Sequence, residues 1–169
     1  MKTKSIQLLN QAVADELYAV HQYMFFHFHC DDEGLDLLAN LFKRTAIQEM
    51  VHIERLADRI LFLKGEVELK AASEVKKIRD VAEMLKQAAK MEDESAKDYN
   101  KKANECAANA DAISKQLFES LVGEEEVHFD QYDTELDNMK KFGPSYLALQ
   151  SIERSKTKNV SSVPAGQNP

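Results

Sequence analysis

The chain has 169 residues, a formal net charge of −7 at pH 7, five glycines and three prolines. This length suits one domain with a well-buried core. The acidic excess argues against a surface that coats DNA, because phosphate binding draws on clustered lysine and arginine. The sequence contains no apolar stretch near the ~20 residues of a membrane span and no signal-peptide pattern at its start. We therefore expect a soluble, cytoplasmic protein without a membrane partner.

Apolar residues recur at spacings of three and four along most of the chain, which predicts an all-α fold. In chain order we expect four long helices and a short fifth one, at residues 5–30, 35–64, 78–107, 111–141 and 146–154. The breaks between them fall at helix-stopping residues, namely Gly34, Gly65, Asn109 and Gly143-Pro144. Residues 156–169 are polar and without apolar periodicity, which predicts a flexible tail after a single domain at residues 1–155.

Two short connections flank one long connection, which predicts two helical hairpins joined by a crossover, the topology of ferritin-like four-helix bundles. In this topology the first and third helices run antiparallel. Cys30 lies as far beyond Glu16 as Cys106 lies beyond Glu92, so the two thiols should point to opposite ends of the bundle. At ~1.5 Å per helical residue they are about 40 Å apart, too far for a disulfide. We predict two free thiols.

Each long helix carries one glutamate near the middle of its apolar stripe. These residues are Glu16, Glu49, Glu92 and Glu125. A buried carboxylate must be neutralised, paired or bound to metal, because burial removes its hydration. No lysine or arginine shares these stripes, so protein cations do not obviously offset the four charges. Two Fe(II) ions would bring the cluster to neutrality.

Two histidines sharpen the prediction of a metal site. His52 lies three residues after Glu49, and His128 lies three after Glu125, so each pair projects from one helix face. Di-iron carboxylate bundles use this ligand set: two helices each supply one glutamate, and the other two helices each supply a Glu-x-x-His pair. The six predicted metal-ligating and catalytic residues are therefore Glu16, Glu49, His52, Glu92, Glu125 and His128. The alternative is a polar bundle core with satisfied histidines.

The spacing between halves indicates an internal pseudo-twofold axis. The separation of Glu16 and Glu49 along the chain equals that of Glu92 and Glu125. The same rule selects Glu92 over Glu94, and Glu125 over the neighbouring glutamates at 124 and 126. It also pairs two tyrosines, each seven residues beyond a first- or third-helix glutamate, namely Tyr23 and Tyr99. We expect them to donate hydrogen bonds to ligand carboxylates, with plain core aromatics as the alternative.

At these motifs the chain resembles the bacterioferritin family, over about residues 5–154. The resemblance rests on the segments Gln48-Glu49-Met50-Val51-His52, Arg59-Ile60-Leu61-Phe62-Leu63-Lys64-Gly65 and Gly123-Glu124-Glu125-Glu126-Val127-His128. It implies a subunit with two iron ions that oxidises Fe(II) with hydrogen peroxide or O2 and deposits Fe(III) mineral inside a closed homo-oligomer. Such a protein protects the cell against oxidative stress. The resemblance also implies that Glu49 and Glu125 bridge or chelate both irons, and that Glu16 and Glu92 are terminal ligands.

The resemblance also implies a position for haem. Met50 matches the axial methionine that bacterioferritins offer to haem between two subunits. Ordinary helix packing also explains a methionine at this position, and we favour packing. Positions that carry extra inner-surface iron ligands in the family are Arg44 and Gln48 here, which argues against an auxiliary iron site. Three more histidines on the first helix are expected at the surface or in an interface: His21, His27 and His29.

The third helix and the polar tail are also similar to the Dps-like, or thioferritin, group, which keeps a bacterioferritin-type centre in a twelve-subunit shell. On that likeness we expect twelve subunits rather than twenty-four. Two other functions remain open from the residues alone. A rubrerythrin-like di-iron peroxidase would use the same ligands, but the Cys-x-x-Cys pairs of its electron-transfer module are absent. A DNA-protecting Dps-type shell is disfavoured by the net charge of −7.

Overall fold

The computed structural model describes residues 2–149 and residue 152. Four long helices account for most of this chain: α1 (Thr3–Asp32), α2 (Asp36–Phe62), α3 (Val81–Ala108) and α4 (Ala112–Phe142). Every bound lies within three residues of the prediction, and no strand occurs in these described ranges. The all-α prediction is therefore confirmed.

The helix ends follow from local side-chain chemistry. Asp80 accepts a hydrogen bond from the backbone N–H of Glu83 at the start of α3, and Asp111 does the same for Ser114 at the start of α4. After α4 the chain turns at Gly143, whose φ of 55° suits a residue without a Cβ. Side-chain caps of this kind occur at the starts of α3 and α4, whereas α1 and α2 begin without one.

The end of α2 differs in one detail from the prediction. The residue with positive φ is Lys64, at 61°, rather than Gly65. Gly65 is needed for space instead, because a Cβ there would lie 2.7 Å from Cγ2 of Ile6 on α1. Gly65, which we expected to end the helix, instead allows the crossover to lie close to α1.

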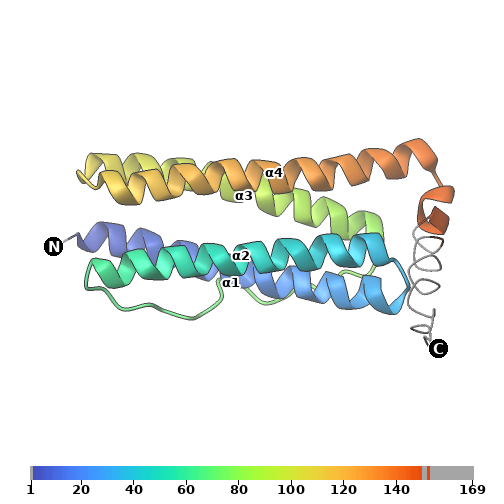
Figure 1. Cartoon of the computed structure of the whole chain (residues 1–169), viewed down its shortest axis with the longest axis horizontal. Coiled ribbons are helices and arrows are strands. Elements are labelled where there is room, and N and C mark those ends of the chain that lie inside the picture. The colour runs from blue at the N-terminus through green and yellow to red at the C-terminus, as the bar shows by residue number, and fades with distance from the viewer. Residues whose placement is uncertain (1, 150–151, 153–169) are drawn as a thin grey trace, which may run out of the picture.

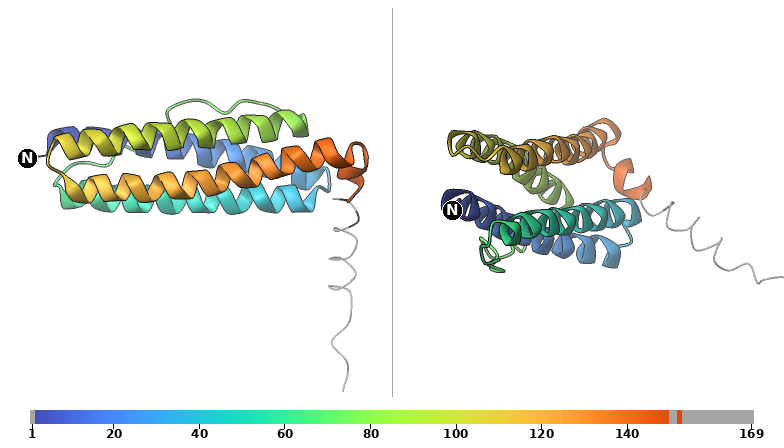
Figure 2. Two further views of the ribbon diagram at one scale, coloured as in Figure 1. Left: turned by 90° about the horizontal axis from the view of Figure 1, so that it is seen from above. Right: turned by 60° about the vertical axis from the view of Figure 1, so that its left-hand side comes forward.

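The helices form two hairpins, α1 with α2 and α3 with α4, that lie side by side (Figure 1). Residues 63–80 run back along the bundle, so α3 starts at the opposite end from where α2 finishes (Figures 1 and 2). Two α1 side chains hold this crossover. Asn10 and Gln22 each donate to one of its backbone carbonyls and each accept from one of its backbone N–H groups. As predicted, α1 and α3 run antiparallel.

The buried apolar residues form two clusters, one toward each end of the bundle. Along every helix the predicted glutamate lies between residues of one cluster and residues of the other. A polar layer therefore interrupts the core at mid-height. Cys30 belongs to one cluster and Cys106 to the other, and both thiols are buried and free, as predicted.

The chain becomes helical again after Gly143. Residues 145–149 and residue 152 are helical, and Tyr146 packs into the core with its hydroxyl donating to Glu135 at 2.6 Å. The end of this fifth helix and the predicted tail at 156–169 lie outside the described residues. No helix in the described part of the chain is long and apolar enough to cross a membrane.

Candidate metal centre

The six residues selected from spacing meet at the polar layer between the two apolar clusters. Their side chains form two four-residue groups, and the candidate ligand atoms within each group lie within 4.8 Å of one another. The groups are Glu16, Glu49, His52, Glu125 and Glu49, Glu92, Glu125, His128. Each of the six is at most 2% exposed. Glu49 and Glu125 belong to both groups, which is the arrangement expected of carboxylates shared by two cations.

The histidines face this cluster with Nδ1. His52 Nδ1 lies 2.8 Å from Glu49, 3.1 Å from Glu16 and 3.1 Å from Glu125. His128 Nδ1 lies 3.2 Å from Glu49. An imidazole nitrogen donates at most one proton, so it cannot satisfy several carboxylate oxygens at once.

Several buried atoms in the cluster are consequently left without a well-formed hydrogen bond. Within the described residues, this holds for both carboxylate oxygens of Glu49, one oxygen each of Glu92 and Glu125, and Nδ1 of His128. Buried polar atoms rarely stay unpaired, because leaving one so costs about 1–3 kcal/mol. Converging oxygens and an imidazole nitrogen form a donor set that suits divalent iron. The residues present therefore fit two cations.

Protons compensate the charge when no cation is bound. Burial, followed by the charge of Glu49, raises the pKa of Glu16 and of Glu92 well above the usual range. Burial and the adjacent Glu92 carboxyl raise the pKa of Glu125 in the same way. Burial would also raise the pKa of Glu49, but the imidazoles of His128 and His52 beside it outweigh burial and lower this pKa to about 2.

The histidines respond in the matching direction. Burial by itself lowers the pKa of both imidazoles. The adjacent carboxyls of Glu125, Glu16 and Glu49 outweigh burial for His52, and Glu49 outweighs it for His128, so both pKa values are raised. Cations that enter this cluster must therefore displace protons from it.

The two predicted tyrosines cross between α1 and α3. Tyr23 on α1 donates its hydroxyl hydrogen to Glu92 on α3, and Tyr99 on α3 donates to Glu16 on α1 at 2.6 Å. The pseudo-twofold axis relates these two hydrogen bonds, and each tyrosine holds its carboxylate from outside the cluster. A third buried tyrosine was not predicted: the ring of Tyr132 lies 5.6 Å from that of Tyr23.

The outer nitrogens of the histidines contact residues that spacing along one helix did not single out. His52 Nε2 lies 2.9 Å from Glu124 on α4, and Glu124 also accepts from Arg55 at 2.6 Å. His128 Nε2 lies 3.0 Å from the side-chain oxygen of Gln48 on α2. Spacing along one helix gave no signal for these contacts, because both join α2 to α4.

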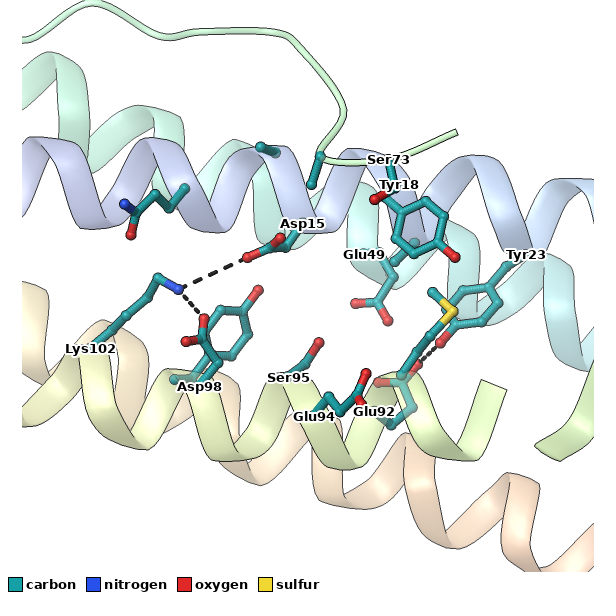
Figure 3. A pocket seen from close by; sticks show the side chains of 16 residues that line it. Asp15, Tyr18, Tyr23, Glu49, Ser73, Glu92, Glu94, Ser95, Asp98 and Lys102 are labelled. Atoms are coloured by element: carbon teal, nitrogen blue, oxygen red, sulfur yellow. Dashed lines mark hydrogen bonds and ion pairs between the residues drawn. The ribbon is translucent and has the colours of Figure 1, made fainter. Parts of the chain in front are cut away.

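A pocket of about 570 Å³ opens between α1 and α3 and reaches the cluster at Glu49 and Glu92 (Figure 3). Its wall carries the buried Lys102, which pairs with Asp98 and lies 3.9 Å from Asp15 (Figure 3). This lysine offsets surface aspartates rather than the ligand carboxylates. The sequence argument missed this lysine, which is buried on α3 three residues after Tyr99, but its ion-pair partners are not ligand glutamates.

Met50 lies on α2 between Glu49 and His52 in sequence but points away from the cluster, with 49% of its surface exposed. Arg44 is exposed on the same helix. Of the first-helix histidines, His21 is exposed, and His27 contacts the carbonyl of Ala39 at 2.8 Å through Nδ1. Neither belongs to the two ligand groups.

Comparison with known proteins agrees with this geometry. The Ferritin family model, a ferritin-like domain, matches residues 6–142. A bacterioferritin of Desulfovibrio desulfuricans is 35% identical over 160 residues, which cover 95% of this chain and 89% of that protein. A bacterioferritin of Brucella melitensis is 35% identical over 140 residues, covering 83% and 87%. A solved structure, the X-ray structure of the Desulfovibrio desulfuricans bacterioferritin with its diiron site in different catalytic states, matches with a TM-score of 0.87 at 35% identity. It covers 89% of this chain and 88% of that chain.

Proposed function

Because the chain belongs to the bacterioferritin family of ferritin-like proteins, we propose that it is a ferroxidase and iron-storage subunit. It oxidises Fe(II) at a centre of two irons and deposits Fe(III) as mineral inside a closed homo-oligomer. The observation that carries this proposal is the buried cluster of four glutamates and two histidines with unpaired ligand atoms. A cluster of this charge inside an apolar core is costly unless cations or protons compensate it.

The ligand roles follow from the two overlapping groups. Glu16 and His52 would hold one cation, Glu92 and His128 would hold the other, and Glu49 and Glu125 could serve both. Two Fe(II) ions bound together supply two electrons, which reduce one hydrogen peroxide to two waters with uptake of two protons. The apolar clusters lie toward either end of the bundle from the centre, the pocket between α1 and α3 gives access to it, and Tyr23 and Tyr99 hold the terminal carboxylates in position.

The stoichiometry of oxidation tests the proposal. When hydrogen peroxide is added anaerobically to protein loaded with about two Fe(II) per subunit, we expect two Fe(II) to be oxidised per peroxide, because the paired irons deliver both electrons together. Iron oxidation is followed by absorbance and hydroxyl radical by spin trapping, with the same Fe(II) in protein-free buffer as the control. A radical yield equal to that of the control would contradict a two-electron centre.

Assembly gives a second test, since a mineral must be enclosed. We propose a closed shell of twelve subunits, each of 19.2 kDa, on the likeness of the third helix and tail to the Dps-like group. The alternative is a shell of twenty-four subunits, which would have twice the mass of the twelve-subunit shell. Sedimentation of the native protein distinguishes them. A monomer or dimer would contradict both.

The exposed face of α2 supports contact between subunits. Met50 is 49% exposed, and Ile47 and Val51 beside it are 47% and 43% exposed. Apolar side chains gathered on one helix face suit burial against another subunit. We expect an apolar contact there in preference to a haem held by Met50.

A further inference from the structure

The candidate ligands follow the internal repeat of this chain, but the residues that contact the outer nitrogens of the two histidines do not. The shift along the sequence that carries Glu16 onto Glu92 also carries Glu49 onto Glu125 and His52 onto His128. The same shift carries Gln48 onto Glu124. These last two residues contact the outer nitrogens of the two histidines, and one is neutral where the other is an acid.

The outer nitrogen of His52 contacts a charged side chain that a neighbouring arginine holds in place. Glu124 contacts His52 Nε2 through one carboxylate oxygen, at 2.9 Å, and accepts from Arg55 through the other, at 2.6 Å. Arg55 in turn donates to Ser120 at 2.6 Å. The carboxylate is therefore held on the histidine from behind.

The half around His128 has a neutral partner. Gln48 offers its side-chain oxygen to His128 Nε2 at 3.0 Å. The repeat carries Arg55 onto Gln131, which is also uncharged. The contact geometry is thus alike in the two halves, and the charge of the acceptor differs.

That charge affects the nitrogen that faces the cations. A neutral imidazole that gives Nδ1 to a metal carries its proton on Nε2 and donates it to the group behind. A carboxylate acceptor draws this proton more strongly than an amide does, which makes Nδ1 a better electron donor. The paired Arg55 offsets the carboxylate's own charge, so this stronger hydrogen bond carries the difference. It acts on the His52 side and is missing on the His128 side.

We propose that the two metal positions of each subunit are unequal, with Glu124 making the Glu16–His52 position the tighter one and Gln48 leaving the Glu92–His128 position the weaker one. This inference rests on the two-metal centre of the proposed function. Glu124 and Gln48 act as positioning residues, through the histidines. Such a pair of positions keeps one cation resident while the other exchanges.

The order of filling tests the inference. Metal-free protein is given about half an equivalent of Zn(II) per subunit, and anomalous scattering from crystals measures the occupancy of each position. We expect the Glu16–His52 position to hold roughly tenfold more zinc, since groups behind metal ligands typically change affinity about 10–100-fold. Glu124→Gln and Gln48→Glu should each bring the occupancies close together. The double exchange, Glu124→Gln with Gln48→Glu, should reverse the order.

Matched controls separate the contact from net charge. Glu126→Gln removes the same charge from an exposed position on α4, and Asn40→Asp adds one at an exposed position on α2. Both should preserve the wild-type order. Equal filling in the wild type, or an order that the double exchange leaves unchanged, would overturn the inference and leave the two-metal centre standing. Zinc absent from both positions would instead overturn the proposed function on which it rests.

Discussion

Replacing Glu49 with alanine is expected to slow Fe(II) oxidation by more than the roughly 10–100-fold typical of a change behind the ligands. Glu49 faces both histidines, at 2.8 Å from His52 and 3.2 Å from His128, and neither of its oxygens has a well-formed hydrogen bond in the described structure. Its loss removes a ligand from both cations at once. Glu125→Ala should have an effect of the same size, because Glu125 also belongs to both ligand groups.

Stopped-flow absorbance after mixing with Fe(II) and oxidant measures the rate of each variant. Glu126→Ala is the matched control, since Glu126 is the exposed neighbour of Glu125 on the same helix, and it should oxidise iron at the parental rate. Sedimentation verifies that every variant still assembles. Parental oxidation by either Glu49→Ala or Glu125→Ala would show that the shared carboxylates had been wrongly assigned.

Metal-free protein is expected to lose stability as the pH rises from about 5 to 8. The pKa values of Glu16, Glu92 and Glu125 are raised in the folded state, so their contribution is full below about 4.5 and is lost as the pH rises through the folded pKa. His52 and His128 also have raised pKa values, so their contribution is full below about 6.5 and is lost as the pH rises through the folded pKa. Each proton that the folded state holds in excess contributes a slope of about 1.4 kcal/mol per pH unit.

Glu49 has the opposite sign. Its pKa is lowered to about 2, so its contribution is present above about 4.5 and is lost only as the pH falls toward 2. It therefore stays nearly constant across the range in question. The five raised groups decide the trend, and the free energy of unfolding should fall by at least a few kcal/mol.

Bound metal should reverse this trend, because cations compete with protons for the same atoms and bind more tightly as the pH rises. Urea unfolding at several pH values, with chelator and with Zn(II), measures both curves. Glu16→Gln with Glu92→Gln should flatten the metal-free curve, since two of the proton-binding groups are gone. A metal-free protein that gained stability over this pH range would contradict the proton distribution described for the cluster.

The sequence by itself determined the helices and the candidate ligands. Apolar periodicity located every long helix to within three residues. Three features selected the six side chains that meet at the polar layer. Each helix has a core-facing glutamate, two of these glutamates have a histidine three residues later, and the glutamate spacing is equal in both halves. These features are readable because the geometry within one helix is local. Residues three, four or seven apart share a face whatever the helix packs against.

Only the tertiary structure decided the contacts between helices. Glu124 entered the sequence argument as a rival of Glu125, yet it lies behind His52 of α2, and Gln48 lies behind His128 of α4. The ring contact between Tyr132 and Tyr23 and the burial of Lys102 likewise depend on neighbouring helices. Contacts of this kind are set by the rotation and axial register of one helix against another. Spacing along a single helix specifies neither quantity, so these partners became visible only once the bundle was assembled.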